Sequence, residues 1–221
     1  MNETWPLEII QRPSPNHGAR PDGSQIDMLV LHYTGMRSTN EALERLCDPA
    51  TEVSAHYLID ETGEVYQLVD ETRRAWHAGR AAWASETDIN SCSIGIELTN
   101  PGHEFGYLAF SKAQMEVLEG LCQSVLARHP IPPSRVLGHS DVAPARKEDP
   151  GELFDWRRLA VRGIGIWPEP RAMPSDHVVG SMTVMRDNLA RLGYQIGTGE
   201  LMDAEARSVI LAFQRIGCRS I

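Results

Sequence analysis

Two short apolar runs limit the folds open to this 221-residue chain more than any other feature. The runs "IDMLVLHYT" (26–34) and "CSIGIELTN" (92–100) are rich in β-branched and aliphatic residues, and each predicts a buried strand. The other predicted elements, in chain order, are a helix at 40–48, a hairpin at 54–70, a helix at 111–130 and a strand at 135–140. This order predicts an α/β fold with a mixed central β-sheet flanked by helices.

A change in composition divides the chain. We expect a first unit over 1–166, a proline-rich linker over 167–180 and a small helical appendage over 181–221. The sequence of the appendage predicts two helices joined by a glycine turn. About forty residues bury too little surface to fold alone, so this unit is expected to dock on the first or to fray. Its apolar stripe consists of Met185, Leu189, Leu192, Val209, Ile210 and Phe213.

Bulk properties exclude several classes of partner. A net charge of −9 argues against nucleic acid and against anionic membranes. The sequence has no apolar run of membrane-spanning length, and its polar N-terminus lacks the pattern of a secretory signal, which predicts a cytoplasmic protein. The cysteines are widely spaced and are expected to be free, buried thiols: Cys47, Cys92, Cys122 and Cys218.

Histidines at two strand ends suggest a metal site. His32 lies at the C-terminal end of the first predicted strand, His139 lies at the end of the last, and Asp149 lies in the loop after it. A lone histidine is more often a hydrogen-bonded core residue, but two histidines and one carboxylate form a set typical of catalytic zinc. His56 and His77 also lie in or beside core elements. The remaining histidines are expected to be solvated: His17, His103, His129 and His177.

The loop "GHSDVAPARKEDPG" (138–151) carries much of the expected chemistry. Its prolines and glycines argue against a regular helix and predict a shaped loop that holds reactive side chains without burying them. Lys147 is one of only two lysines among 21 basic residues, and beside a metal it would stabilise an oxyanion. Glu97, inside an apolar strand, would serve as a general base. The alternatives are that Glu97 pairs with an arginine and that Lys147 is an ordinary surface charge.

Several segments together resemble a known family. "LVLHYTG", "VSAHYLID", "WHAG", "NSCSIGIELTNPG" and "GHSDVAPARKEDPGELFDW" are similar to the type-2 N-acetylmuramoyl-L-alanine amidases, whose superfamily includes phage lysozyme-amidases and peptidoglycan recognition proteins. The resemblance covers roughly residues 8–160. It implies that one Zn²⁺ is held by His32, His139 and Asp149, that Glu97 is the catalytic acid/base and that Lys147 stabilises the transition state. It also implies that Trp76 and His77 line the substrate cleft, whereas His56 is a core residue and not a ligand.

The resemblance extends to the appendage. Residues 181–221 are similar to the first two helices of a small peptidoglycan-binding module, whose third helix is missing here. The expected activity is hydrolysis of the amide between N-acetylmuramic or anhydro-muramic acid and the L-alanine of a stem peptide, in cell-wall recycling. The expected partner is therefore a muropeptide. Two rival functions are a non-catalytic muropeptide receptor and a metallopeptidase that cuts within the stem peptide. The oligomeric state is left open.

Overall fold

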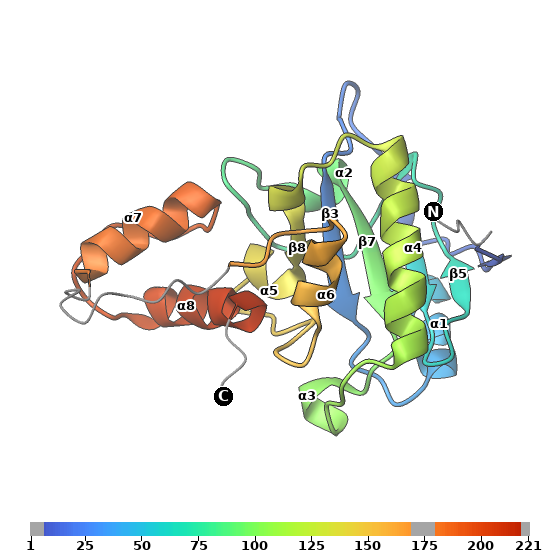
Figure 1. Cartoon of the computed structure of the whole chain (residues 1–221). Helices are drawn as coiled ribbons and strands as arrows, with labels where there is room; N and C mark the ends of the chain where they lie inside the picture. Colours follow the sequence, from blue (N-terminus) through green and yellow to red (C-terminus); the bar gives the residue numbers. More distant parts are fainter. Residues whose placement is uncertain (1–6, 169–179, 218–221) are drawn as a thin grey trace.

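A mixed six-stranded sheet forms the centre of the computed structural model, which describes residues 7–168 and 180–217 (Figure 1). Its strand order is β1-β5-β4-β7-β3-β8, with β4, β7, β3 and β8 parallel and β5 antiparallel to β4. A two-stranded sheet pairs β2 with β6. The strands are β1 (Ile9–Gln11), β2 (His17–Ala19), β3 (Met28–Tyr33), β4 (Tyr57–Ile59), β5 (Val65–Gln67), β6 (Arg73–Ala75), β7 (Ser93–Leu98) and β8 (Val136–Gly138).

Eight α-helices lie within the described residues, and each predicted helix is among them. The expected capping box is present at the start of α4, where Ser111 and Gln114 bond each other's backbone N–H groups. None of the described helices is long and apolar enough to cross a membrane. The helices are α1 (Thr39–Cys47), α2 (Ile89–Cys92), α3 (Gly102–Phe105), α4 (Lys112–Arg128), α5 (His139–Val142), α6 (Trp156–Val161), α7 (Met182–Leu192) and α8 (Ala204–Gly217), with 3₁₀ turns at Pro49–Thr51 and Pro133–Arg135.

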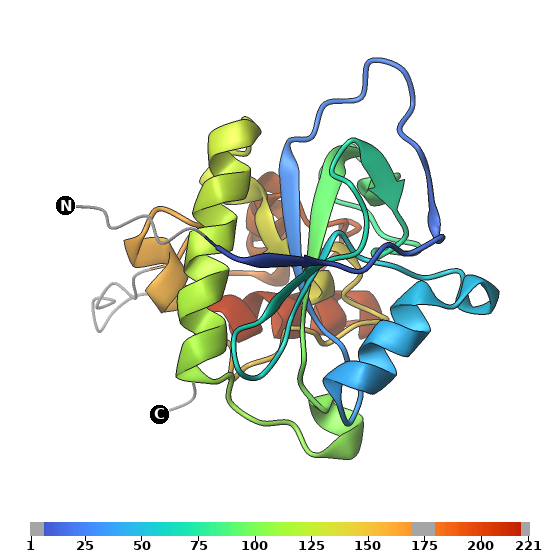
Figure 2. The ribbon, with the colours of Figure 1, turned by 90° about the vertical axis from the view of Figure 1, so that its right-hand side faces the viewer.

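The two faces of the sheet carry different residues because side chains alternate along each strand. On β3, Leu29 and Leu31 pack with α4 and α6, whereas Met28 and Val30 pack with α5 and with the C-terminal helices. Figure 2 shows α4 along one face and the C-terminal helices on the other. His32 continues the Met28–Val30 series, so it points to the second face. The His32 side chain therefore lies outside the larger apolar core, which is on the opposite face of the sheet.

The C-terminal helices dock on the rest of the chain (Figure 1). Of the two expected outcomes, docking and fraying, docking is therefore the one observed. Leu189 and Val209 join a buried cluster with Trp83, Leu137 and Val142. The predicted stripe is correct except at Leu192, which is 50% exposed because it lies on the outer side of α7. The expected linker falls mostly on residues 169–179, outside the described residues.

Four expectations are wrong. The segment 138–151 contains one helical turn, α5, which fits because Gly138 precedes it and Pro144 follows it. The same segment buries its reactive side chains instead of exposing them, since His139 and Asp149 pack below the surface.

His103 and His129 are not freely solvated, because each contacts a carboxylate. Cys47, Cys92 and Cys122 are free thiols as expected, but the expected burial is wrong for Cys47 and Cys92, which are partly exposed. His177 and Cys218 lie outside the described residues.

Candidate metal centre and active site

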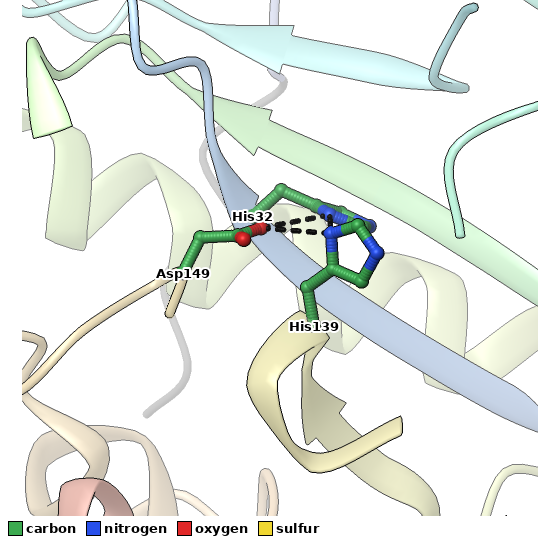
Figure 3. A group of neighbouring side chains, drawn as sticks. All are labelled: His32, His139 and Asp149. Carbon is green, nitrogen blue, oxygen red and sulfur yellow. Dashed lines mark hydrogen bonds and ion pairs between the residues drawn. The ribbon is translucent and has the colours of Figure 1, made fainter. Parts of the chain in front are cut away.

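The three predicted ligands converge on one point. β3 and β8 are parallel neighbours, so their carboxyl ends place His32 beside His139, and the loop after α5 returns Asp149 to the same place (Figure 3). The Nδ1 atoms of the histidines are 2.9 Å apart, and Asp149 Oδ2 lies 3.1 Å from His32 Nδ1 and 3.0 Å from His139 Nδ1. All three side chains are buried.

The donor set fits zinc. His139 Nε2 lies 3.0 Å from the carbonyl oxygen of Ala78, which can only accept, so Nε2 carries a proton and Nδ1 of the neutral ring is bare. A bare nitrogen and a carboxylate oxygen repel each other unless a cation lies between them. Zinc bonds such atoms at about 2.0–2.1 Å in a tetrahedral set, which requires ligand atoms roughly 3.3 Å apart, close to the observed spacing.

Electrostatics keep the ligands in the forms that a metal needs. Burial, with the nearby His139, lowers the pKa of His32 to about 4, so the His32 ring is neutral at pH 7. Burial alone would raise the pKa of Asp149, but the positive charge that the adjacent histidines carry when they are protonated lowers it below its ordinary value. A neutral imidazole and an ionised carboxylate are both competent ligands.

Glu97 lies beside this group on the neighbouring strand. It is in register with His32 in the parallel pair β3–β7, and both side chains point to the same face. Glu97 Oε2 is buried without a hydrogen-bond partner among the described residues. Burial, reinforced by the charge of Asp149, raises the pKa of Glu97 to about 8 against the lowering effect of Lys147. A carboxyl group with this pKa can exchange a proton near neutral pH, as a general acid or base must.

Lys147 is partly buried in the loop between α5 and Asp149. Its charge lowers the pKa values of Glu97 and His32. A cation that acts on these two groups suits stabilisation of a developing oxyanion.

The structure places the two predicted substrate residues differently. The His77 ring is buried, with Nδ1 3.1 Å from His32 Nε2, so it contacts a candidate ligand. Burial lowers the pKa of His77 well below its ordinary value. Trp76 is partly exposed, and its backbone bonds to Ser54. Contact of either residue with substrate remains a prediction.

Other histidine and polar groups near the site also have defined places. His56 lies outside the ligand group, because its Nδ1 accepts from Gly95 N and its Nε2 bonds the Arg73 carbonyl. Sequence reasoning did not identify Asn90 and Ser93, which contact the His77 segment. The signal in the sequence was weak, because both are small polar residues: Asn90 lies in α2 just before the apolar strand β7, and Ser93 is the first residue of β7.

Comparisons with known proteins agree with this geometry. Residues 22–152, more than half of the chain, match the family model described as N-acetylmuramoyl-L-alanine amidase. The chain is 38% identical over 208 residues to the N-acetylmuramoyl-L-alanine amidase AmiD of Escherichia coli, a match that spans 86% of this chain and 74% of AmiD. It is 33% identical to the 1,6-anhydro-N-acetylmuramyl-L-alanine amidase AmpD of Citrobacter freundii, over 72% of this chain and 92% of AmpD.

Solved structures extend the likeness to the fold. A complex of E. coli AmiD with anhydro-N-acetylmuramic acid-L-Ala-D-γ-Glu-L-Lys has a TM-score of 0.73 at 36% identity, covering 89% of this chain and 82% of AmiD. AmpDh3 of Pseudomonas aeruginosa in complex with anhydromuramic pentapeptide has a TM-score of 0.75 at 30% identity, covering 89% and 85%. The sheet, the buried His-His-Asp group and the matched sequence lead to one assignment. The chain belongs to the N-acetylmuramoyl-L-alanine amidase family.

Proposed function

We propose that this protein is a zinc amidase that hydrolyses the bond between the lactyl group of anhydro-N-acetylmuramic acid and the L-alanine of a stem peptide. The observation that carries the proposal is the convergence of His32 Nδ1, His139 Nδ1 and Asp149 Oδ2 within 3.1 Å of one another. The choice of an anhydro-muropeptide as substrate is supported by AmiD and AmpDh3, whose solved structures include complexes with anhydro-muropeptides.

Each residue has a separate task in this proposal. His32, His139 and Asp149 hold one zinc ion, which when bound would polarise the scissile carbonyl and make water more acidic. Glu97 takes a proton from the attacking water and returns it to the leaving amine of L-alanine. Lys147 stabilises the negative charge that forms on the carbonyl oxygen. Trp76 and His77 are proposed to line the substrate cleft.

We further propose the division into a catalytic unit (1–166), a linker (167–180) and a helical peptidoglycan-binding-like unit (181–221). The match to AmpD supports it, since nearly all of AmpD aligns with only 72% of this chain. A place in cell-wall recycling follows from the proposed substrate. The predicted cytoplasmic location is tested separately by cell fractionation.

Product analysis tests the proposed reaction. Defined muropeptides with an anhydro or a reducing muramic sugar are incubated with the protein, and the products are identified by mass spectrometry. We expect a free sugar and an intact stem peptide, formed faster from the anhydro substrate. A shortened peptide would indicate a metallopeptidase, and an unchanged substrate would indicate a binding protein. The His139→Ala variant controls for contaminating activity.

A further inference from the structure

Two adjacent residues in the loop after β6 contact both candidate ligand histidines, on the side of each ring away from the metal-facing atoms. His77 Nδ1 lies 3.1 Å from His32 Nε2, and the Ala78 carbonyl oxygen lies 3.0 Å from His139 Nε2. One short segment therefore meets both ligands, although His32 and His139 come from elements more than a hundred residues apart.

A chain of hydrogen bonds determines which nitrogen of His32 carries its proton. Ser93 Oγ lies 2.5 Å from the Ile89 carbonyl and donates its single proton there. Ser93 Oγ must then accept from His77 Nε2, which is 3.0 Å away. In the neutral His77 ring Nδ1 is consequently bare and accepts from His32 Nε2–H. The remaining nitrogen of His32, Nδ1, is left with a free lone pair toward the metal site.

The tautomer of the second candidate ligand, His139, is determined by a backbone carbonyl group. The Ala78 carbonyl accepts from His139 Nε2–H and also from the Arg146 guanidinium at 2.8 Å. Arg146 donates to the Arg80 carbonyl as well, at 2.8 Å, so it spans the turn that carries Ala78. This carbonyl keeps the proton of His139 on Nε2 and leaves Nδ1 bare.

The segment itself is anchored. Asn90 Oδ1 accepts from the backbone N–H groups of His77 at 3.1 Å and of Ala78 at 2.9 Å. The His77 ring lies directly on β7 at Gly95, where an added Cβ would come within 2.5 Å of the ring. Glycine at this position thus allows the imidazole to approach the strand, and Asn90 holds the backbone that carries the ring.

We propose that the His77–Ala78 segment, anchored by Asn90 and Ser93, sets the zinc affinity by holding His32 and His139 in the tautomer with a bare Nδ1. His77, Asn90 and Ser93 are positioning residues, because they act on the metal only through its ligands. Partners of this kind typically change metal affinity by about 10–100-fold. The inference rests on the zinc site of the proposed function.

The test measures the zinc dissociation constant of the full chain by competition with a chromophoric chelator. Ser93→Ala and Asn90→Ala are expected to bind zinc about 10–100-fold more weakly. Asn90→Asp retains an acceptor oxygen and should recover most of the affinity. The matched control is Asn16→Ala, which removes another buried asparagine that braces the loop at 48–53 without reaching the histidines.

The outcomes separate this inference from the proposed function. If wild-type protein binds no zinc, the proposed function fails. If wild type binds zinc and the folded Ser93→Ala and Asn90→Ala variants bind it equally tightly, only the inference is overturned. Long-range ¹H–¹⁵N NMR spectra of the zinc-loaded wild type show directly which ring nitrogen of each histidine carries the proton. This second measurement does not require any variant to fold. Protons on Nε2 of both His32 and His139 support the inference, and a proton on Nδ1 of either contradicts it.

Discussion

The two lysines of the chain lie in very different surroundings. Lys147 is partly buried and acts electrostatically on Glu97 and His32, whereas Lys112 is exposed and pairs with Glu116 along α4 at 3.4 Å. Lys147→Ala is expected to lower kcat on the order of 10²–10³-fold with zinc still bound, because one group that stabilises the oxyanion is lost. Lys112→Ala is the matched control. Equal kcat in both variants would show that Lys147 is an ordinary surface charge.

At the scale of single residues, the sequence was enough to predict which side chains contribute reactive groups. His32, Glu97 and His139 stand at strand ends or interrupt apolar runs, where a polar residue is costly unless it is used. It could not predict that Ala78 contributes a carbonyl oxygen, because every residue has one. The contacts of Ser93 likewise depend on how the chain folds back on β7.

At the scale of elements, a buried carboxylate joins α4 to the β5–β6 connection. Glu71 accepts hydrogen bonds from Arg128 at 2.6 Å, His129 at 2.7 Å and Tyr57 at 2.7 Å. Burial alone would raise the pKa of Glu71, but these hydrogen bonds lower it from its ordinary 4.5 to about 2. A lowered pKa means that ionised Glu71 stabilises the fold above about pH 4.5, and that this contribution disappears as the pH falls toward 2.

This linkage predicts a pH-dependent difference between wild type and Glu71→Gln. A shift of this size corresponds to about 3 kcal/mol, so the wild type should be more stable at pH 7 by an amount of that order. The gap should shrink as the pH falls from about 4.5 to about 2, measured by urea unfolding at a series of pH values. The exposed Glu116→Gln is the control and should change stability little. A gap that stays constant with pH would rule out this contribution of Glu71.

Long or strongly patterned elements were predictable, and so were the short strands β4, β5 and β8, whereas β1, β2, β6 and α5 were not. The α4 helix has a capping box and apolar residues at helical spacing, and both were readable. β1, β2 and β6 each have three residues, and their strand form depends on a partner strand distant in sequence. The single turn of α5 was missed because proline and glycine flank it closely.

At the scale of the whole molecule, one tyrosine links the C-terminal helices to the helix that carries a ligand. Tyr194 Oη donates to Asp141 Oδ1 at 2.6 Å, and the other oxygen of Asp141 accepts from Gly138 N at 2.7 Å, next to His139. The Tyr194 ring packs edge-on against Trp83 with centroids 4.8 Å apart. The docking partners are long-range contacts, so the sequence predicted that docking was possible without showing where.

Removing this hydroxyl should weaken the fold. Tyr194→Phe keeps the aromatic contact but leaves a buried Asp141 oxygen without its donor, which is expected to reduce the free energy of unfolding by about 1–3 kcal/mol. Tyr66→Phe is the control, because the Tyr66 hydroxyl donates to Glu64 at an exposed position. Denaturant unfolding measures both. If the two variants were equally stable, the Tyr194–Asp141 bond would contribute nothing measurable to docking.

The central claim is that one zinc ion, held by His32, His139 and Asp149, is required for hydrolysis of the amide. The most direct test removes metal with a chelator and adds zinc back in steps, while amidase activity on a defined anhydro-muropeptide is followed. We predict no activity without metal, recovery that stops at about one zinc per chain, and no recovery in folded His139→Ala. Full activity of the metal-free protein would show that zinc is not required.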